Sequence, residues 1–365
     1  MWWSMSSVTS FAPGRVELLG NHTDYNEGVV LSAAIELGVT ATGRRREDLQ
    51  IVLTSDGAPG KVVVLRAEPI QRSGGWEDYP LGVAEMLRQA GAEAGGFEMN
   101  FTASLPSGAG LSSSAAIEVA TALCLCRLYP FPISPMDIAR LCRRAENEFV
   151  GVSCGLLDQV SSVFGKKDEV VFLDCRTESV STIPFPPSLS LLIIHSGVKH
   201  ALTGGEFNER RAQCFEAARI MGVRALRDVT SAELEGAELS DLLRRRARHV
   251  VGENERVLEG INFLRAGNGS AFGRLMTASH ESSIVNFENS TAELDELVRL
   301  AIAQPGCHGA RLTGGGFGGA IVALVDKEAI SSVQEIILEN YVKATGHHAQ
   351  AYPCIVSNGA TVTAF

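Results

Sequence analysis

Apolar and polar residues alternate along the N-terminal part of the chain, which is the pattern of half-buried strands. It predicts extended segments over residues 8–11, 15–20 and 29–37, with a turn at 12–14, and a hairpin over 50–66 that turns at 57–60. Beyond residue 75 the apolar positions recur every three or four residues, as they do on one face of a helix. This spacing predicts helices over residues 76–88, 115–128 and 138–149, with a short strand over 98–103.

The second half of the chain begins with a nearly continuous apolar run over residues 189–194, which is typical of a buried central strand. Upstream of this run we expect a strand pair over residues 164–174. Downstream the pattern predicts helices over 206–221, 257–264, 294–301 and 331–344, and strands over 320–325 and 349–356. Because strands and helices are mixed rather than regularly alternating, we expect an α+β fold.

Length, charge and cysteine usage narrow the class of protein. A chain of 365 residues is long enough for two domains with sizeable cores. Its formal net charge of −10, without a basic stripe, argues against a nucleic-acid-binding surface. Its eight cysteines lack the paired C-x-x-C spacing of zinc sites. No secretory signal and no membrane-spanning apolar run is visible, so we expect a cytoplasmic protein with reduced thiols and no membrane partner.

The candidate chemistry centres on residues 105–116, which read Leu-Pro-Ser-Gly-Ala-Gly-Leu-Ser-Ser-Ser-Ala-Ala. Glycines let the backbone approach a ligand closely, and the free N–H groups of such a turn attract an anion. The following helix adds the unpaired N–H groups of its N-terminus. The stretch therefore predicts a cradle for a triphosphate, although it is not a Walker loop, because no lysine follows the second glycine. The alternative is a glycine-rich turn before a core helix.

Three further stretches have polar residues or glycines in unusual positions. Residues 21–28 form a dense polar cluster between apolar strands, which suits either a binding loop or a long solvated turn. Asp158 lies among apolar and small residues, and because an unpaired buried carboxylate is costly, it is either paired or used in chemistry. Residues 314–319 match the G-x-G-x-x-G pattern, but the apolar run after them predicts a strand where a dinucleotide fold requires a helix.

Taken together and in this order, these stretches resemble the galactokinase branch of the GHMP small-molecule kinases. The resemblance spans nearly the entire chain and rests on residues 14–28, 105–116 and 312–319, with support from 154–159 and 206–211. It implies a two-domain α+β GHMP kinase fold with the active site in the interdomain cleft, and we expect the domains to cover residues 1–180 and 181–365. It also implies an ATP- and Mg²⁺-dependent enzyme that phosphorylates the anomeric hydroxyl of a hexose.

The resemblance also implies roles for individual residues. Asp158 falls on the family's catalytic carboxylate, and Arg15 falls on the arginine that approaches it. Lys199 lies where the family has a basic residue near the transferred phosphate. The magnesium positions are Ser114 and Glu146, and the sugar-contacting positions are Asn21, His22, Asp24 and Phe207. The ATP-binding positions are Pro106, Gly108, Ala109, Gly110, Leu111, Ser112, Ser113 and Ser114 in the loop, with Trp76 and Tyr79 near the adenine.

Two of the sugar positions depart from the family's pattern. Asn21 replaces a glutamate that contacts the carbon-6 hydroxyl in the family, and Phe207 replaces a sugar-contacting tyrosine. A glutamate would repel a carbon-6 carboxylate by about 4 kcal/mol at about 4 Å in an effective dielectric near 20. An asparagine removes that charge and can donate a hydrogen bond. The substrate is therefore left open between galactose, a galacturonate-like acid and another hexose.

Three functions follow from the resemblance. The leading one is a galactokinase-type 1-kinase that converts D-galactose and ATP to galactose 1-phosphate and ADP. The second is a non-catalytic sugar sensor, against which the uninterrupted serines 112–114 and the presence of Asp158 argue. The third is a mevalonate- or homoserine-type kinase, against which the run His22-Thr23-Asp24-Tyr25 argues. The expected partners are a sugar and ATP, and we expect a monomer.

Overall fold

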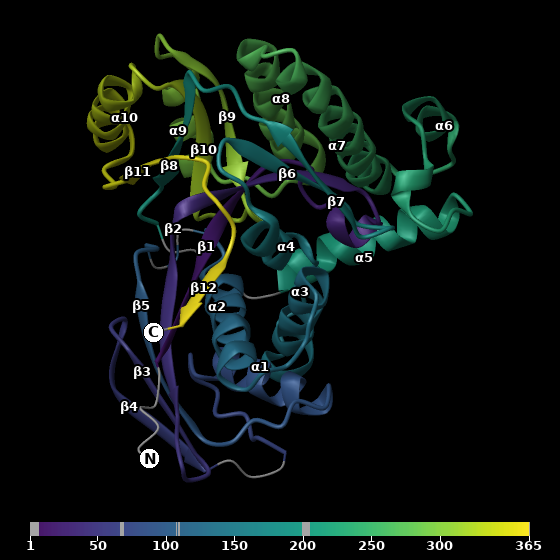
Figure 1. Ribbon diagram of the computed structural model, residues 1–365. Coiled ribbons are helices and arrows are strands. Elements are labelled where there is room, and N and C mark those ends of the chain that lie inside the picture. Colours follow the sequence, from purple (N-terminus) through teal and green to yellow (C-terminus); the bar gives the residue numbers. More distant parts are fainter. Residues whose placement is uncertain (1–6, 66–68, 107, 109, 199–204, 365) are drawn as a thin grey trace.

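The computed structural model describes residues 7–65, 69–106, 108, 110–198 and 205–364 (Figure 1). Its strands are β1 (Val8–Leu19), β2 (Val29–Arg45), β3 (Gln50–Ser55), β4 (Ala58–Leu65), β5 (Phe97–Ala103), β6 (Glu169–Asp174), β7 (Ser179–Pro184), β8 (Leu189–His195), β9 (Cys307–Thr313), β10 (Ala320–Asp326), β11 (Gln350–Cys354) and β12 (Thr361–Ala364). Its α-helices are α1 (Asp78–Gln89), α2 (Ser113–Leu128), α3 (Pro135–Arg144), α4 (Leu157–Phe164), α5 (Gly205–Ile220), α6 (Ser231–Gly236), α7 (Asp241–Arg265), α8 (Gly269–Ser282), α9 (Ala292–Ile302) and α10 (Ile330–Thr345). Short 3₁₀ or π segments are η1 (Asp24–Asn26), η2 (Ala145–Val150), η3 (Leu226–Asp228) and η4 (Ser283–Phe287).

The strands of the described residues form two sheets. The larger has the order β12-β1-β2-β5-β3-β4, and β6 pairs with β2 and with β7. In this sheet β3 and β5 run parallel, whereas β1 and β2 are antiparallel. The smaller sheet is antiparallel, with the order β11-β8-β10-β9. Because β12 pairs with β1, the C-terminal strand returns to the sheet in which the chain begins, while the domain division at residue 180 stays a prediction.

Helices cover the two sheets separately. α2 packs on β1 and β2, with α1, α3 and α4 beside it, in the lower part of Figure 1. In the upper part, α8 and α9 pack on β9, and α10 packs on α9 and β11. This mixture confirms the expected α+β class. Among the described residues, no helix combines the length and the apolar composition that crossing a lipid bilayer requires.

Three local predictions were wrong. The hairpin predicted to turn at residues 57–60 turns at residues 56–57, because β4 already begins at Ala58 and pairs there with Ser55. Residues 12–14 do not form a turn, because β1 runs through them and shifts register against β2 between Pro13 and Arg15. A bulge there accommodates a proline, which cannot donate to the ladder. Residues 164–174 are not a strand pair: α4 ends at Phe164, and β6 pairs with the later strand β7. Short apolar runs do not distinguish strand from helix by periodicity.

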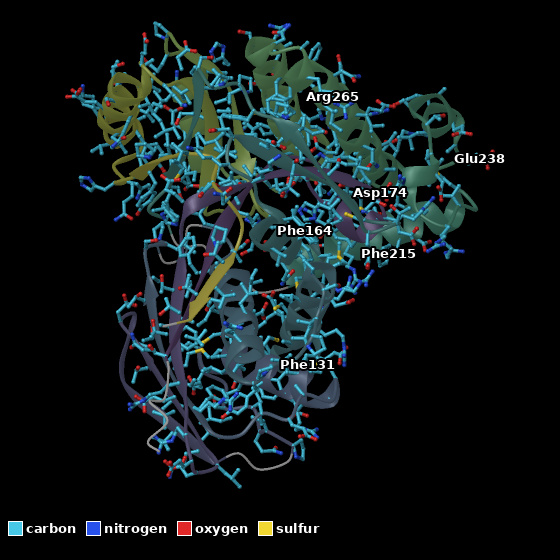
Figure 2. All side chains as sticks on the ribbon, viewed as in Figure 1. Phe131, Phe164, Asp174, Phe215, Glu238 and Arg265 are labelled. Carbon is cyan, nitrogen blue, oxygen red and sulfur yellow. The ribbon has the colours of Figure 1, made fainter. Side chains whose placement is uncertain are left out.

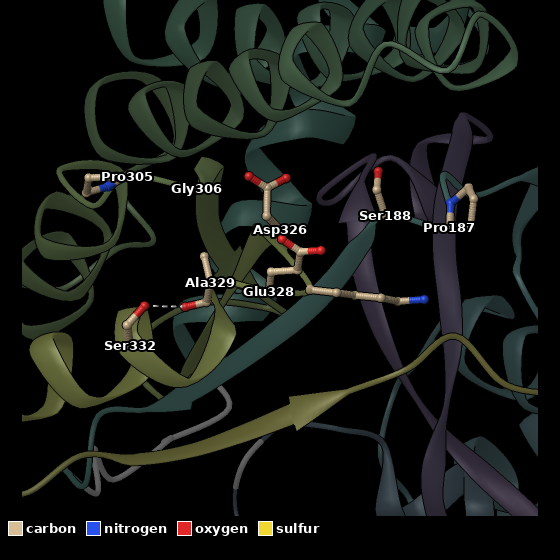
Figure 3. A pocket seen from close by; sticks show the side chains of 9 residues that line it. Pro187, Ser188, Pro305, Gly306, Asp326, Glu328, Ala329 and Ser332 are labelled. Atoms are coloured by element: carbon tan, nitrogen blue, oxygen red, sulfur yellow. Dashed lines mark hydrogen bonds between the residues drawn. The ribbon is translucent and has the colours of Figure 1, made fainter.

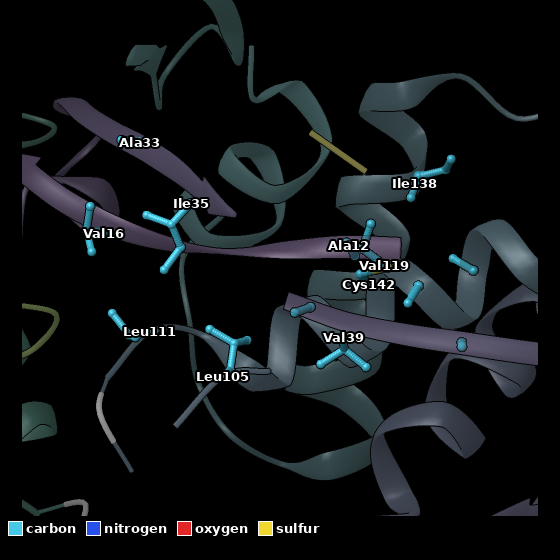
Figure 4. Close-up of a cluster of buried hydrophobic side chains, with 14 of the residues drawn as sticks. Ala12, Val16, Ala33, Ile35, Val39, Leu105, Leu111, Val119, Ile138 and Cys142 are labelled. Atoms are coloured by element: carbon cyan, nitrogen blue, oxygen red, sulfur yellow. The ribbon is translucent and has the colours of Figure 1, made fainter. Parts of the chain in front are cut away.

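The core fixes the glycine–serine loop, which is the part of residues 105–116 that precedes α2. Leu105 and Leu111 stand on either side of its two glycines, and both are buried in the cluster that contains Val16 and Ile35 (Figure 4). A side chain at Gly14 would overlap Leu105 and the carbonyl oxygen of Leu111, each 2.6 Å from the position of its Cβ. The close approach of β1 to the loop therefore requires glycine at this position.

Ion pairs fasten η3, which lies between α5 and α6, to the larger sheet. Asp174, at the end of β6 and labelled in Figure 2, accepts hydrogen bonds of 2.6 and 2.5 Å from the guanidinium of Arg227. Beside it, Arg176 donates to both carboxylate oxygens of Asp228 and to Glu27. Since Glu27 belongs to the polar loop after β1, these pairs hold that loop against the end of β6 and against η3.

Candidate active site

The centre of the site is an ion pair between β1 and the first turn of α4. Arg15 Nε lies 2.6 Å from Asp158 Oδ1, and Arg15 Nη2 lies 2.7 Å from Asp158 Oδ2. The third guanidinium nitrogen, Nη1, donates to the carbonyl oxygen of Gly110 at 2.8 Å. The hydroxyl of Ser112 donates to Asp158 Oδ2 at 2.6 Å. The Asp158 side chain keeps 23% of its surface exposed, so an oriented carboxylate faces an accessible space.

The loop before α2 is arranged to leave the start of this helix free. Ser112 has a left-handed backbone with φ of 58°, and its hydroxyl bonds to Asp158 instead of capping the helix. The N–H groups of the first turn, which includes the exposed Ser113, thus have no side-chain cap at this position. Such N–H groups and the positive end of the helix dipole bind anions. Ser107 and Ala109 lie outside the described residues.

The two glycine-rich stretches of the sequence lie against each other. A Cβ on Gly110 would be 3.8 Å from the carbonyl oxygen of Thr313, and one on Gly314 would be 3.7 Å from that of Gly110. The hydroxyl of Thr313 accepts from the backbone N–H of Glu17 at 3.1 Å, which ties β9 to β1. The turn after β9 therefore borders the same space as the loop before α2.

Ser114 and Glu146, the two positions predicted to bind magnesium, lie near each other beside this loop. Glu146 is buried in η2 and accepts hydrogen bonds from Gln159 Nε2 at 2.9 Å and from Cys154. Burial raises the pKa of Glu146, and the negative charge of Asp158 raises it further, whereas the hydroxyl of Ser114 lies near enough to favour the ionised form of this carboxyl and so to lower its pKa. A cation there would offset the repulsion by Asp158.

The donor set fits magnesium that arrives with a nucleotide. The described residues hold no group of three or more histidines, cysteines and acids able to bind a metal alone. Mg²⁺ is commonly bound by one or two carboxylates together with substrate phosphates and water. The carboxylate of Glu146 and the hydroxyl of Ser114 are oxygen ligands of this kind, next to the uncapped start of α2.

His22 connects the polar loop to the glycine-rich turn. Its Nε2 lies 2.9 Å from the carbonyl oxygen of Gly315, and its Nδ1 lies 2.8 Å from the hydroxyl of Tyr25. Burial lowers the pKa of His22 to about 4, so the ring is neutral at pH 7. Because a carbonyl oxygen only accepts, Nε2 carries the proton and Nδ1 accepts from Tyr25. The ring of Phe207 lies 5.2 Å from that of His22 and 5.7 Å from that of Tyr25, centroid to centroid.

Asp24 and Asp158 face the same region from different segments. A Cβ on Gly155 would overlap the Asp24 carboxylate, so this carboxylate lies directly against the segment that leads into α4. Burial raises the pKa of Asp24, and the charge of Asp158 adds to the effect. The polar loop therefore supplies His22 and Asp24 to the space that Asp158 faces, which is the arrangement expected of a sugar subsite.

Trp76, Tyr79 and Lys199 are the remaining predicted positions, and no hydrogen bond among the described residues joins the first two to Asp158 or to the loop before α2. The indole of Trp76 stands edge-on to Phe101, with ring centroids 5.8 Å apart. Burial raises the pKa of Tyr79, and the nearby charges of Glu146 and Glu118 raise it further. Their adenine-binding role stays a prediction, and Lys199 lies outside the described residues.

Sequence reasoning missed several buried charges around the site. Glu17 on β1 is buried beside Arg311 on β9, whose Nη1 lies 3.5 Å from Glu17 Oε1. Burial raises the pKa of Glu17 to about 7. Glu253 on α7 accepts the backbone N–H groups of Gly20 and Asn21, each at 2.8 Å. Asp158 stood out in the sequence as a single acid among apolar and small residues. Glu118 in α2 is also a single acid among apolar residues, so the same pattern could have identified it.

A surface hollow lies away from this cluster, at the opposite end of the smaller sheet. It is lined by Ser188 before β8 and by Asp326 at the end of β10 (Figure 3). The glycine-rich turn lies instead at the other end of β10, before Ala320. The hollow is therefore separate from the site built around Asp158.

Comparison with known sequences assigns the chain to a family. The galactokinase galactose-binding signature matches residues 4–45, the GHMP kinases N terminal domain matches 78–166, and the GHMP kinases C terminal domain matches 261–343. A galactokinase from Glaesserella parasuis serovar 5 (strain SH0165) is 41% identical over 98% of this chain and 95% of its own length. A galactokinase from Roseiflexus sp. (strain RS-1) is 40% identical over 95% of this chain and 91% of its own. The chain belongs to the galactokinase family of GHMP kinases.

Solved structures agree with this assignment. Lactococcus lactis galactokinase complexed with galactose superposes with a TM-score of 0.94 at 33% identity, covering 97% of this chain and 95% of its own. A mevalonate kinase reaches a TM-score of 0.73 at 20% identity, covering 96% and 99%, and shares the fold alone. The resemblance, the two-domain GHMP kinase fold and the enzyme class are thus confirmed. This member of the galactokinase family is a sugar phosphotransferase.

Proposed function

We propose that this protein is a galactokinase, which transfers the γ-phosphoryl group of ATP to the anomeric hydroxyl of D-galactose. The products are galactose 1-phosphate and ADP. The observation that carries the proposal is the Asp158 carboxylate, held by Arg15 and Ser112 between the loop before α2 and the polar loop after β1. One loop supplies the anion-binding helix start, and the other supplies His22 and Asp24.

Asp158 orients the attacking oxygen of the sugar. Three donated hydrogen bonds from Arg15 and Ser112 fix the plane of its carboxylate. The anomeric hydroxyl donates a hydrogen bond to this carboxylate, which aligns its oxygen with the γ-phosphorus. The bond from that oxygen to phosphorus then forms while the bond to the departing ADP oxygen breaks, and the hydroxyl proton passes to the Asp158 carboxylate, which later releases it to solvent. Phosphoryl transfer depends mainly on such alignment and on stabilisation of charge.

In this proposal, the negative charge on the transferred phosphoryl group is stabilised by the helix start, by Arg15 and by a magnesium ion. The free N–H groups at the start of α2 bind the phosphates, and Arg15 approaches them from β1. Ser114 and Glu146 would hold Mg²⁺, which supplies positive charge to phosphate oxygens when it is bound. Lys199 is proposed as a further cation near the phosphates.

The surroundings of Asn21 favour galactose over a galacturonate-like acid. The amide nitrogen of Asn21 donates to the carbonyl oxygen of Gly314 at 2.8 Å, and it lies 3.4 Å from Glu17 Oε2. Since both hydrogens of this amide face acceptors within the protein, neither is available to a sugar carboxylate. The nearby Glu17 carboxyl and the carbonyl of Gly314 would oppose a further negative group.

Location and assembly complete the proposal. All eight cysteines are free thiols, and burial raises the pKa of each of them above its usual value. Free thiols suit a reducing compartment, which supports the cytoplasm, where ATP is also supplied. We propose a monomer with no nucleic-acid or membrane partner.

The test is an assay of ADP release with single free sugars: galactose, galacturonate, glucose and galactosamine. We expect the highest kcat/KM with galactose, and loss of turnover in Asp158→Ala but not in the surface control Asp48→Ala. A preference for galacturonate would identify the enzyme as a uronate kinase instead. Binding of galactose and ATP without ADP release would identify a sensor.

A further inference from the structure

We propose that Asn21 and Asn289 form an amide latch, which joins the polar loop after β1 to the glycine-rich turn after β9 and thereby positions the sugar subsite. The inference rests on the proposed sugar kinase activity and names two positioning residues for it. Asn289 follows η4, so the latch joins three segments that are far apart in the sequence. It assigns Asn21 a role within the protein instead of a direct contact with the sugar.

Three hydrogen bonds donated by the two amides make up the latch. Asn289 Nδ2 donates to Asn21 Oδ1 at 3.0 Å and to the carbonyl oxygen of Gly315 at 3.1 Å. Asn21 Nδ2 donates to the carbonyl oxygen of Gly314 at 2.8 Å. Two consecutive carbonyl groups of the turn are thus each held by one of the two amides. Asn21 is 1% exposed and Asn289 is fully buried, so water does not compete for these bonds.

The backbone of the turn is shaped to receive Asn289. The N–H of Phe317 donates to the carbonyl oxygen of Asn289 at 2.6 Å. Gly316 has a φ of +81°, and a side chain there would overlap both the backbone oxygen and the amide of Asn289. Glycine at this position is therefore required for the close approach as well as for the left-handed backbone. The latch and the turn depend on each other.

The latch needs donors at both positions. A carboxylate only accepts hydrogen bonds, so an acid at position 21 or 289 would face a carbonyl oxygen without a hydrogen between them. Asparagine and aspartate have nearly the same shape, which makes aspartate a test of the donor rather than of packing. At position 21, aspartate would also add a negative charge beside Glu17.

The consequence for the enzyme concerns the sugar side of the site. His22 follows Asn21 directly and donates to the same carbonyl oxygen of Gly315 that Asn289 reaches. Loosening the latch therefore moves His22 and the turn together. Among the described residues, no hydrogen bond links Asn289 to Arg15, to Asp158 or to the start of α2, so we expect ATP binding to be affected less.

A double-mutant cycle tests the latch. Asn21→Asp and Asn289→Asp are each expected to raise the KM for the sugar about tenfold, with the KM for ATP changed less than twofold. The double variant should fall well short of the product of the single effects, because both changes remove the same shared contact. The matched control is Asn286→Asp, three residues from Asn289, whose amide donates to Ser282. It should change neither constant. Fully multiplicative effects, or equal rises in both KM values, would overturn the proposal.

Hydrogen exchange gives a readout that does not depend on the substrate. Without ligands, Asn21→Asp should speed amide exchange over residues 313–319 relative to the wild type, and Asn289→Asp should speed it over residues 20–26. Unchanged exchange at the distant segment would overturn the latch even if galactose is the substrate. Conversely, faster exchange in a protein that does not phosphorylate galactose would support the latch and reject the proposed function.

Discussion

Arg15 and Asp158 face each other through two parallel hydrogen bonds, Nε to Oδ1 at 2.6 Å and Nη2 to Oδ2 at 2.7 Å. Their segments are separated by 143 residues, and the pair closes the larger sheet onto α4. The remaining guanidinium nitrogen reaches the loop before α2 through the carbonyl oxygen of Gly110. One arginine thus sets the position of the carboxylate relative to the loop that is proposed to bind the phosphates.

Replacing Arg15 by lysine keeps the charge and removes the two-point geometry. An ammonium group cannot hold both carboxylate oxygens in one plane and reach Gly110 as well. We expect kcat in Arg15→Lys to fall by about 10- to 100-fold, measured by ADP release. Arg44→Lys, which alters an exposed pair with Glu98, is the control and should keep full activity. An unchanged kcat in Arg15→Lys would show that the two-point geometry is dispensable.

Ser112 is the second test of the same carboxylate. The family resemblance assigns this serine to ATP, whereas its hydroxyl donates to Asp158 at 2.6 Å. Ser112→Ala should therefore lower kcat by about tenfold or more and leave the KM for ATP nearly unchanged. Ser332→Ala, which changes an exposed serine, serves as the control. A large rise in the KM for ATP with kcat intact would return Ser112 to the nucleotide.

Much of the fold followed from periodicity alone. The helix after the glycine–serine loop and the central strand over residues 189–194 match α2 and β8 closely, since long apolar patterns report burial directly. The bulge at Pro13 and the pairing of β6 with β7 were missed. Both depend on strand pairing between segments, which local composition does not report.

In the candidate site, too, the sequence indicated residues with an unusual local pattern and missed those that matter through contacts between distant segments. Single unusual residues such as Asp158 stood out because a lone acid in an apolar stretch needs a partner, and Arg15 is that partner. Asn289 and Arg311 gave no such signal, because asparagine is common in loops and arginine is usually exposed to solvent. Their significance lies in burial against other segments, which requires the three-dimensional structure.

Glu118 provides a prediction about stability. This glutamate is fully buried in α2 and accepts from Gln159 Nε2 at 3.3 Å, and burial holds its pKa well above the usual value. The folded protein therefore keeps a proton that the unfolded chain releases above pH 4.5, so this group makes folding less favourable as the pH rises from there. Glu118→Gln preserves the shape without an ionisable group.

The gap in the free energy of unfolding between Glu118→Gln and the wild type should therefore shift in favour of the variant between pH 5 and pH 8. Denaturant melts at each pH measure it, and Glu335→Gln on the surface of α10 is the control. A gap that does not change with pH would mean that Glu118 titrates alike in the folded and unfolded chains.

His22 provides the opposite pH dependence. Burial lowers its pKa from 6.5 to about 4, so the unfolded chain binds a proton between these values that the folded chain does not. Folding thus becomes less favourable as the pH falls from 6.5 to 4, by about 3 kcal/mol at 1.36 kcal/mol per pKa unit. His249, whose pKa burial lowers to about 3, adds to the loss over the same range.

In His22→Gln the side-chain amide can still donate to Gly315, but no group at this position titrates. The loss of unfolding free energy between pH 6.5 and pH 4, measured by urea denaturation, should therefore be smaller in this variant than in the wild type. His347→Gln, an exposed site after α10, should leave the slope as it is. An identical slope in His22→Gln would mean that the ring becomes protonated in the folded state, and Nδ1 could then no longer accept from Tyr25. Because that hydrogen bond orients the ring toward Gly315, such a result would also separate the sugar subsite from the glycine-rich turn under acid conditions.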